Sequence, residues 1–110
     1  MSWRRRHYHA GILDELLVMC DPEGEAYLAV DRRSRQIAFL RDMDRQRRDE
    51  GRLMMTDRQA AYLRDIQRQW LGQARTVMRR SRVLGWSPVV TEECLARARA
   101  ALDEGDEDLF

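Results

Sequence analysis

The sequence contains no lysine: all 20 of its basic residues are arginine, set against 19 acidic residues in a chain of 110. Selection for planar, bidentate contacts to phosphate or carboxylate would favour arginine, because lysine cannot form them. Codon usage in a GC-rich genome would produce the same ratio. With either origin, the chain carries guanidinium groups that can bind phosphates through paired hydrogen bonds.

Cysteine and long apolar runs are also scarce. The two cysteines, Cys20 and Cys94, are too few for a disulfide framework, and we interpret both as thiols in a reducing compartment. No apolar run approaches the roughly 18 residues of a membrane-spanning helix, and the N-terminal segment lacks the apolar region of a secretory signal. We therefore expect a cytoplasmic protein with no membrane partner.

The charges that are present are segregated along the chain. Residues 52–82 carry eight arginines and two acidic residues, which gives a net charge of +6. Residues 14–25 contain five acidic residues and no arginine, and residues 83–110 contain seven acidic residues and two arginines, so each segment has a net charge of −5. The overall charge of +1 thus conceals strong local fields.

Apolar spacing and helix-breaking residues predict an all-α fold, a small bundle of about four helices. We expect the first helix over Ala10–Cys20, ended by the sequence Asp-Pro-Glu-Gly, and the second over Glu25–Asp49, ended by Gly51. Residues 26–30 could instead form a short strand, although nothing nearby offers a pairing partner. We predict a helix for this stretch.

The third helix has the clearest start. Thr56 and Gln59 form a capping-box pattern, so the helix should begin at Thr56. A continuous apolar stripe then predicts a long central helix; its members are Leu63, Ile66, Trp70, Ala74, Val77 and Leu84. After a turn at Trp86-Ser87-Pro88, a last helix should open at Thr91.

The chain divides into three predicted parts. These are a basic and aromatic arm over residues 1–9, a single helical domain over 10–103, and an acidic C-terminal tail over 104–110. The tail is either a solubilising end or a segment that competes for basic surfaces. The predicted core consists of Leu16, Leu17, Leu28, Phe39, Leu63, Ile66, Trp70, Val77 and Leu95.

The strongest candidate site is an arginine ridge on the third helix. On a helical wheel its five members fall within a band of about 60°, facing away from the apolar stripe. The ridge is long enough to contact several phosphates of a nucleic-acid backbone, and the alternative is an ordinary solvated helix face. Its members are Arg64, Arg68, Arg75, Arg79 and Arg82.

Two further arginine groups could extend this surface. One is Arg4, Arg5 and Arg6 in the N-terminal arm, where neighbouring rings could stack on bases or merely cover the edge of the core. The other is Arg41, Arg45 and Arg48, which the helical wheel of the second helix places away from its apolar side.

Chemistry beyond binding finds little support in the sequence. His7, His9, Cys20 and Cys94 are suitable zinc ligands, but their spacing matches no compact zinc site. The sequence has no nucleophile motif, no phosphate-binding glycine loop and no His-Glu-x-x-His pattern. We therefore expect no enzyme activity, no metal, no cofactor and no small-molecule substrate.

The segment from Phe39 to Trp70 contains Phe-Leu-Arg-Asp-Met, Gly-Arg-Leu and Met-Thr-Asp-Arg-Gln-Ala-Ala-Tyr-Leu-Arg-Asp-Ile. It resembles a helix-turn-helix-capped pattern found in small phage and plasmid proteins. In size and arginine-rich helical character the chain is also similar to small subunits of CRISPR effector complexes and to phage-encoded inhibitors. These resemblances imply a role in mobile-element biology and assign no functional residue.

Together these patterns predict a non-catalytic accessory protein that binds the backbone of RNA or DNA. It would belong to a phage or other mobile element, or to a ribonucleoprotein complex. The alternative is a small protein-binding inhibitor or adaptor that engages a larger protein complex through its charged patches.

Overall fold

The computed structural model describes residues 3–80 and 88–107, with the side chains of residues 8–76 and 88–104. Its four helices are α1 (Trp3–Val18), α2 (Arg35–Glu50), α3 (Asp57–Arg80) and α4 (Glu92–Glu107). The described residues contain no strand, so the prediction of a small all-α bundle is confirmed. No helix in these ranges is long and apolar enough to cross a membrane.

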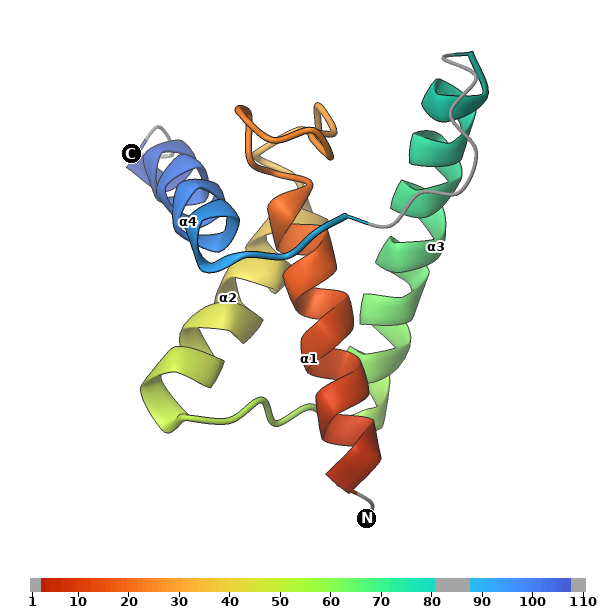
Figure 1. Cartoon of the computed structure of the whole chain (residues 1–110). Coiled ribbons are helices and arrows are strands. Elements are labelled where there is room, and N and C mark those ends of the chain that lie inside the picture. The colour runs from red at the N-terminus through yellow and green to blue at the C-terminus, as the bar shows by residue number, and fades with distance from the viewer. Residues whose placement is uncertain (1–2, 81–87, 108–110) are drawn as a thin grey trace.

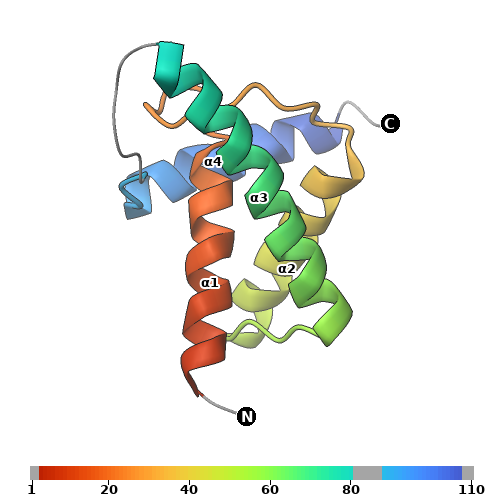
Figure 2. The ribbon, with the colours of Figure 1, turned by 90° about the vertical axis from the view of Figure 1, so that its right-hand side faces the viewer.

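Helix α1 lies in the middle of the bundle and packs against each of the other three helices (Figure 1). Helix α3 is the longest, and α4 lies on the far side of α1 from α3, as Figure 2 also shows. The first helix begins at Trp3, well before the expected Ala10. Residues 3–9 of the expected arm therefore extend α1 by about two turns.

The second helix is ten residues shorter at its start than predicted. Residues 25–34 have no helix, and α2 begins only after Ser34, whose hydroxyl accepts a hydrogen bond from the Ile37 amide at 3.2 Å. In the segment before α2, two aspartate side chains accept hydrogen bonds from nearby backbone amides: Asp21 from the Glu23 amide and Asp31 from the Arg33 amide. Such local bonds compete with helix formation and favour turns. Gly51 ends α2 in the left-handed conformation, with φ of 76°.

The predicted capping box at the start of α3 is confirmed. The Gln59 amide donates to the Thr56 hydroxyl at 3.1 Å, and the Thr56 amide donates to Gln59 Oε1 at 2.9 Å. Thr91 caps α4 in a related way, with the Cys94 amide 3.2 Å from its hydroxyl. The predicted turn at Trp86-Ser87 lies outside the described residues, and α4 continues to Glu107, past the expected boundary at 103.

The core gathers apolar side chains from all four helices. Leu16, Leu17, Leu63, Ile66 and Trp70 are fully buried as predicted, whereas Leu28, Phe39 and Leu95 pack at the edge and are partly buried. The side chain of Val77 lies outside the described residues. The core cluster also includes Ile12, Leu13, Met19, Cys20, Ile37, Leu40, Met43, Leu53 and Leu102.

Candidate nucleic-acid interface

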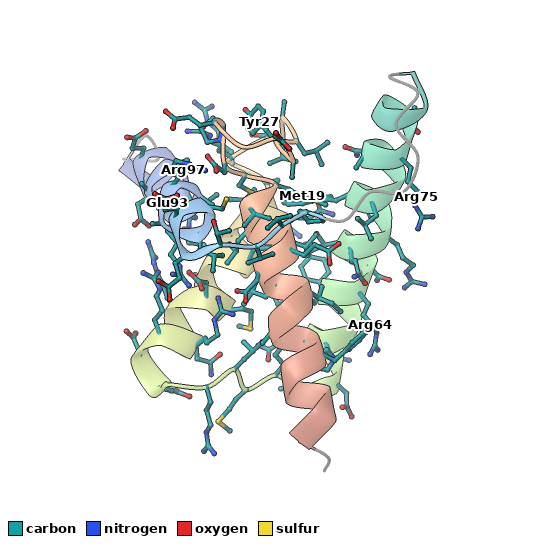
Figure 3. All side chains as sticks on the ribbon, in the orientation of Figure 1. Met19, Tyr27, Arg64, Arg75, Glu93 and Arg97 are labelled. Carbon is teal, nitrogen blue, oxygen red and sulfur yellow. The ribbon has the colours of Figure 1, made fainter. Side chains whose placement is uncertain are left out.

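The apolar stripe of α3 fixes which side of the helix faces solvent. Leu63, Ile66 and Trp70 are buried against the rest of the bundle. Because they share one side of the helix, Arg64 and Arg75 project from the other, away from α1 (Figure 3). Arg68 is exposed on the same outer side.

Hydrogen bonds between polar side chains of α2 and α3 fix which side of α3 faces the bundle. The Trp70 indole donates to Gln36 Oε1 at 3.1 Å, and the Gln36 amide group donates to Gln69 Oε1 at 2.8 Å. Beside them, the rings of Phe39 and Tyr62 meet edge to face with their centroids 4.8 Å apart. A buried indole with a hydrogen-bond partner is a directional contact, so α3 presents its arginines from a well-anchored face.

Two arginines on this face have no ion pair or hydrogen bond among the residues whose side chains are described. They are Arg64 and Arg75, which lie eleven residues apart, roughly 16 Å along the helix axis. Arg68, between them, pairs with Asp65 one turn earlier. Both partners of that pair are more than half exposed, so it contributes little energy and can open to release Arg68.

The remaining members of the predicted ridge are only partly placed. Arg79 lies in the last turn of α3, its side chain beyond the described set, and Arg82 lies outside the described residues altogether. Residues 4–6, the three N-terminal arginines, lie in the first turn of α1. That turn is at the same end of the bundle as the start of α3 (Figures 1 and 2).

Arg41 does not point away from the bundle, as its position on the helical wheel predicted. It is only 7% exposed, and its Nη1 donates to the backbone carbonyl of Leu102 at 3.3 Å. Helix α4 covers this part of α2, so Arg41 lies between the two helices and not at the surface. Arg41 therefore belongs to the packing of α2 against α4.

The other two candidates on α2 also face acidic groups of the same chain. Arg45 lies 3.5 Å from Asp103 of α4, and Arg48 Nε lies 3.3 Å from Asp44. Both arginines remain exposed at the surface. The structure thus separates Arg41, Arg45 and Arg48, the α2 candidates that engage acidic or carbonyl groups of the chain, from Arg64 and Arg75 of α3.

Asp44 is the centre of a charged network that the sequence reasoning missed. This carboxylate is 2% exposed and accepts hydrogen bonds from Arg99 and Arg47, and Arg47 also lies 2.6 Å from Asp14. Burial opposes its ionisation, but the hydrogen bonds and charges of Arg99 and Arg47 outweigh that cost and lower the pKa of Asp44. The i, i+3 spacing of Asp44 and Arg47 was the available sequence signal.

A second buried carboxylate, Asp21, was also missed. It is fully buried after the end of α1, and Arg97 Nε donates to it at 3.0 Å. The two arginines inside the acidic last helix, Arg97 and Arg99, were the signal, because each reaches a buried acid on another segment.

The possible zinc ligands do not form a cluster in the described part of the chain. No three His, Cys, Asp or Glu side chains gather there in a way that could hold a metal ion. Cys20 is buried, its thiol lies 3.7 Å from the Leu16 carbonyl, and burial raises its pKa to about 12. Cys94 is partly exposed on α4, and the side chain of His7 is not among those described.

Helix α4 carries much of the acidic charge but does not cover the arginine face of α3. The two helices lie on opposite sides of α1 (Figures 1 and 2). Through Glu107, therefore, the acidic segment leaves Arg64 and Arg75 open to solvent.

No protein-family model matches the chain, and comparisons with curated proteins and with solved structures find no match either.

Proposed function

We propose that the protein is a non-catalytic nucleic-acid-binding accessory protein that contacts backbone phosphates through the outer face of α3. The observation that carries this proposal is the contrast between two arginine sets. Arg41, Arg45 and Arg48 of α2 face partners within the chain, whereas Arg64 and Arg75 are exposed without an ion pair among the described side chains. Guanidinium groups held on a rigid helix face suit phosphate oxygens.

The arrangement supports binding with little reading of sequence. Arg64 and Arg75 lie on one side of α3, and the exposed Arg68 stands between them. Arg79 and Arg82 would continue the same face, and Arg4, Arg5 and Arg6 would add charge near the start of α3. Contacts of this kind position a protein on the backbone and make its affinity strongly dependent on salt. A cytoplasmic role in a mobile element or a ribonucleoprotein complex would use them.

A matched pair of triple variants tests this proposal. Arg64, Arg68 and Arg75 are changed together to alanine, and binding to random single- and double-stranded oligonucleotides is measured across a salt series. Each lost phosphate contact on B-DNA should lower the slope of log affinity against log salt by about 0.9. The expected result is therefore weaker binding and a shallower slope on every sequence.

The control changes Arg33, Arg35 and Arg52 to alanine. All three are exposed and lie outside α3, so this variant loses the same charge without touching the proposed face. It should retain most of the affinity. Absence of binding at low salt, or equal losses in the two triple variants, would contradict the proposal.

A further inference from the structure

A cleft of about 310 Å³ lies at the end of α1, away from the arginine face of α3. Its walls come from the loop that follows α1, from the segment that leads into α4, and from the first turns of α4. None of the α3 residues whose side chains are described lines it. Among the described residues that line it are Asp21, Glu23, Glu25, Ala26, Pro88, Val89 and Arg97.

The floor of the cleft is held by the buried Asp21. Its carboxylate accepts from Arg97 Nε at 3.0 Å and from the Glu23 amide at 3.0 Å. The backbone of Gly24 packs closely against the same carboxylate, because a Cβ at this position would lie only 3.0 Å from Asp21 Oδ2. The guanidinium group of Arg97 is thus already paired with Asp21. This ion pair joins the loop after α1 to α4 without any ligand.

The rim of the cleft combines acidic groups with an apolar wall. Glu23 and Glu25 are exposed, and Glu23, whose side chain is 79% exposed, lies 3.9 Å from the already paired Arg97. Val89 is 78% exposed, unusual for a valine, and stands beside Pro88 along the same wall. Of the described residues, three acids and one arginine line the cleft, so together they give it a negative field.

We propose that this cleft docks an arginine or lysine side chain of a basic protein partner. Such a side chain has an apolar stem and a cationic head, and the cleft offers both complements. The stem would lie along Val89 and Pro88, and the head would meet Glu23 and Glu25. This site favours an adaptor role and is independent of the proposed contacts of α3 with nucleic acid.

The test uses a fluorescent peptide of alternating arginine and leucine as the probe. Its anisotropy is titrated with the full chain at low salt, and amide NMR shifts locate the contact. The expected shifts involve Gly24, Ala26 and Val89. The double variant Glu23→Gln and Glu25→Gln should weaken binding by about three- to tenfold, since two exposed ion pairs are lost.

Two matched controls keep the result specific. The variant Asp49→Asn with Glu50→Gln removes the same charge from exposed positions at the end of α2 and should bind the peptide within about twofold of the parent. Val89→Ser should weaken binding, while the same change at the exposed Met54 should not. None of these side chains is in the core, so the folded state should persist.

Several outcomes would overturn the proposal. These are no binding of the basic peptide, equal binding of a peptide with glutamate in place of arginine, equal losses in the two double variants, or shifts centred elsewhere. Sedimentation that shows dimers dissociated by the Glu23 and Glu25 changes would identify a second copy of the chain as the occupant. Nucleic-acid binding measured on the same variants reports separately on α3.

Discussion

The guanidinium group of Arg99 binds the carboxylate of Asp44 through two hydrogen bonds, from Nε to Oδ2 at 2.7 Å and from Nη2 to Oδ1 at 2.9 Å. This bidentate contact joins α4 to α2 across 55 positions of sequence. Arg47 adds a third hydrogen bond to the same carboxylate at 2.6 Å. This ion pair therefore holds α4 against the bundle, together with the burial of Ala98, Ala101 and Leu102.

The same network explains how a nearly neutral chain can present a basic face. Asp14 of α1, Asp44 of α2 and Asp103 of α4 pair with arginines of α2 and α4, as in the contacts of Asp14 with Arg47 and of Asp103 with Arg45. On α3, Asp65 pairs with Arg68, while Arg64 and Arg75 have no ion pair among the described side chains. Unpaired positive charge thus lies on the outer face of α3.

Asp44→Asn should destabilise the protein strongly. The change leaves the largely buried guanidinium group of Arg99 without its charged partner and leaves that of Arg47 with Asp14 alone. Breaking a buried pair from one side costs about 3–5 kcal/mol, and the partial exposure of both arginines places the expected loss at about 2–3 kcal/mol. Urea unfolding followed by circular dichroism measures it. Asp42→Asn, at an exposed position on the same helix, should cost under about 0.5 kcal/mol, and equal losses would contradict the role of Asp44.

The pH dependence of stability should carry the signature of Asp44. Its pKa in the folded protein lies below the ordinary value of 3.8, so between the two values the unfolded chain binds more protons. The stabilisation is therefore present above about pH 5 and is lost as the pH falls through the folded pKa. Melting temperatures of the parent and Asp44→Asn should converge over that range.

The difference in melting temperature between the parent and Asp44→Asn is also free of the opposing pH effect of Glu15. Burial raises the pKa of Glu15, so its ionisation destabilises the fold as the pH rises. Both proteins share that effect. A constant gap between the two melting curves from neutral pH down through the acid range would show that the lowered pKa of Asp44 is wrong.

Local signals in the sequence predicted local structure well. The capping box of Thr56 and Gln59 and the stop at Gly51 depend on groups within a few residues, and both are confirmed. The start of α2 was missed because the side chains of Asp21 and Asp31 bond to nearby amides, and a helical wheel assigns no energy to such turns.

The orientation of Arg41 could not be predicted in the same way. Its partner is the Leu102 carbonyl, 61 positions away, and only the docking of α4 makes that contact available. The wheel correctly placed Arg64 and Arg75 opposite the buried stripe, because no described element packs on the outer side of α3. Helical periodicity thus succeeds on a helix with one buried side and fails on α2, where two sides are covered.

The two cysteines should differ in reactivity. Burial raises the pKa of Cys20 to about 12, so its thiol stays protonated and shielded at neutral pH, whereas Cys94 is partly exposed. Titration of the native protein with a disulfide reagent at pH 8 should modify one thiol quickly, and denaturant should release the second. Cys94→Ser should abolish the fast phase, and a fast phase that survives this change would contradict the assignment.

Two exposed threonines, one that caps α3 and one inside it, should respond to alanine in different ways. Thr56 caps the helix through the Gln59 amide, so Thr56→Ala should lower the free energy of unfolding by about 1 kcal/mol. Thr76 lies inside the helix, and its hydroxyl only bonds back to the Gly72 carbonyl at 3.0 Å. Because alanine has the higher helix propensity, Thr76→Ala should be neutral or should stabilise the protein by about 0.5 kcal/mol. Urea unfolding of both variants checks the contrast, and a loss at Thr76 that equals the loss at Thr56 would show that the cap contributes nothing specific.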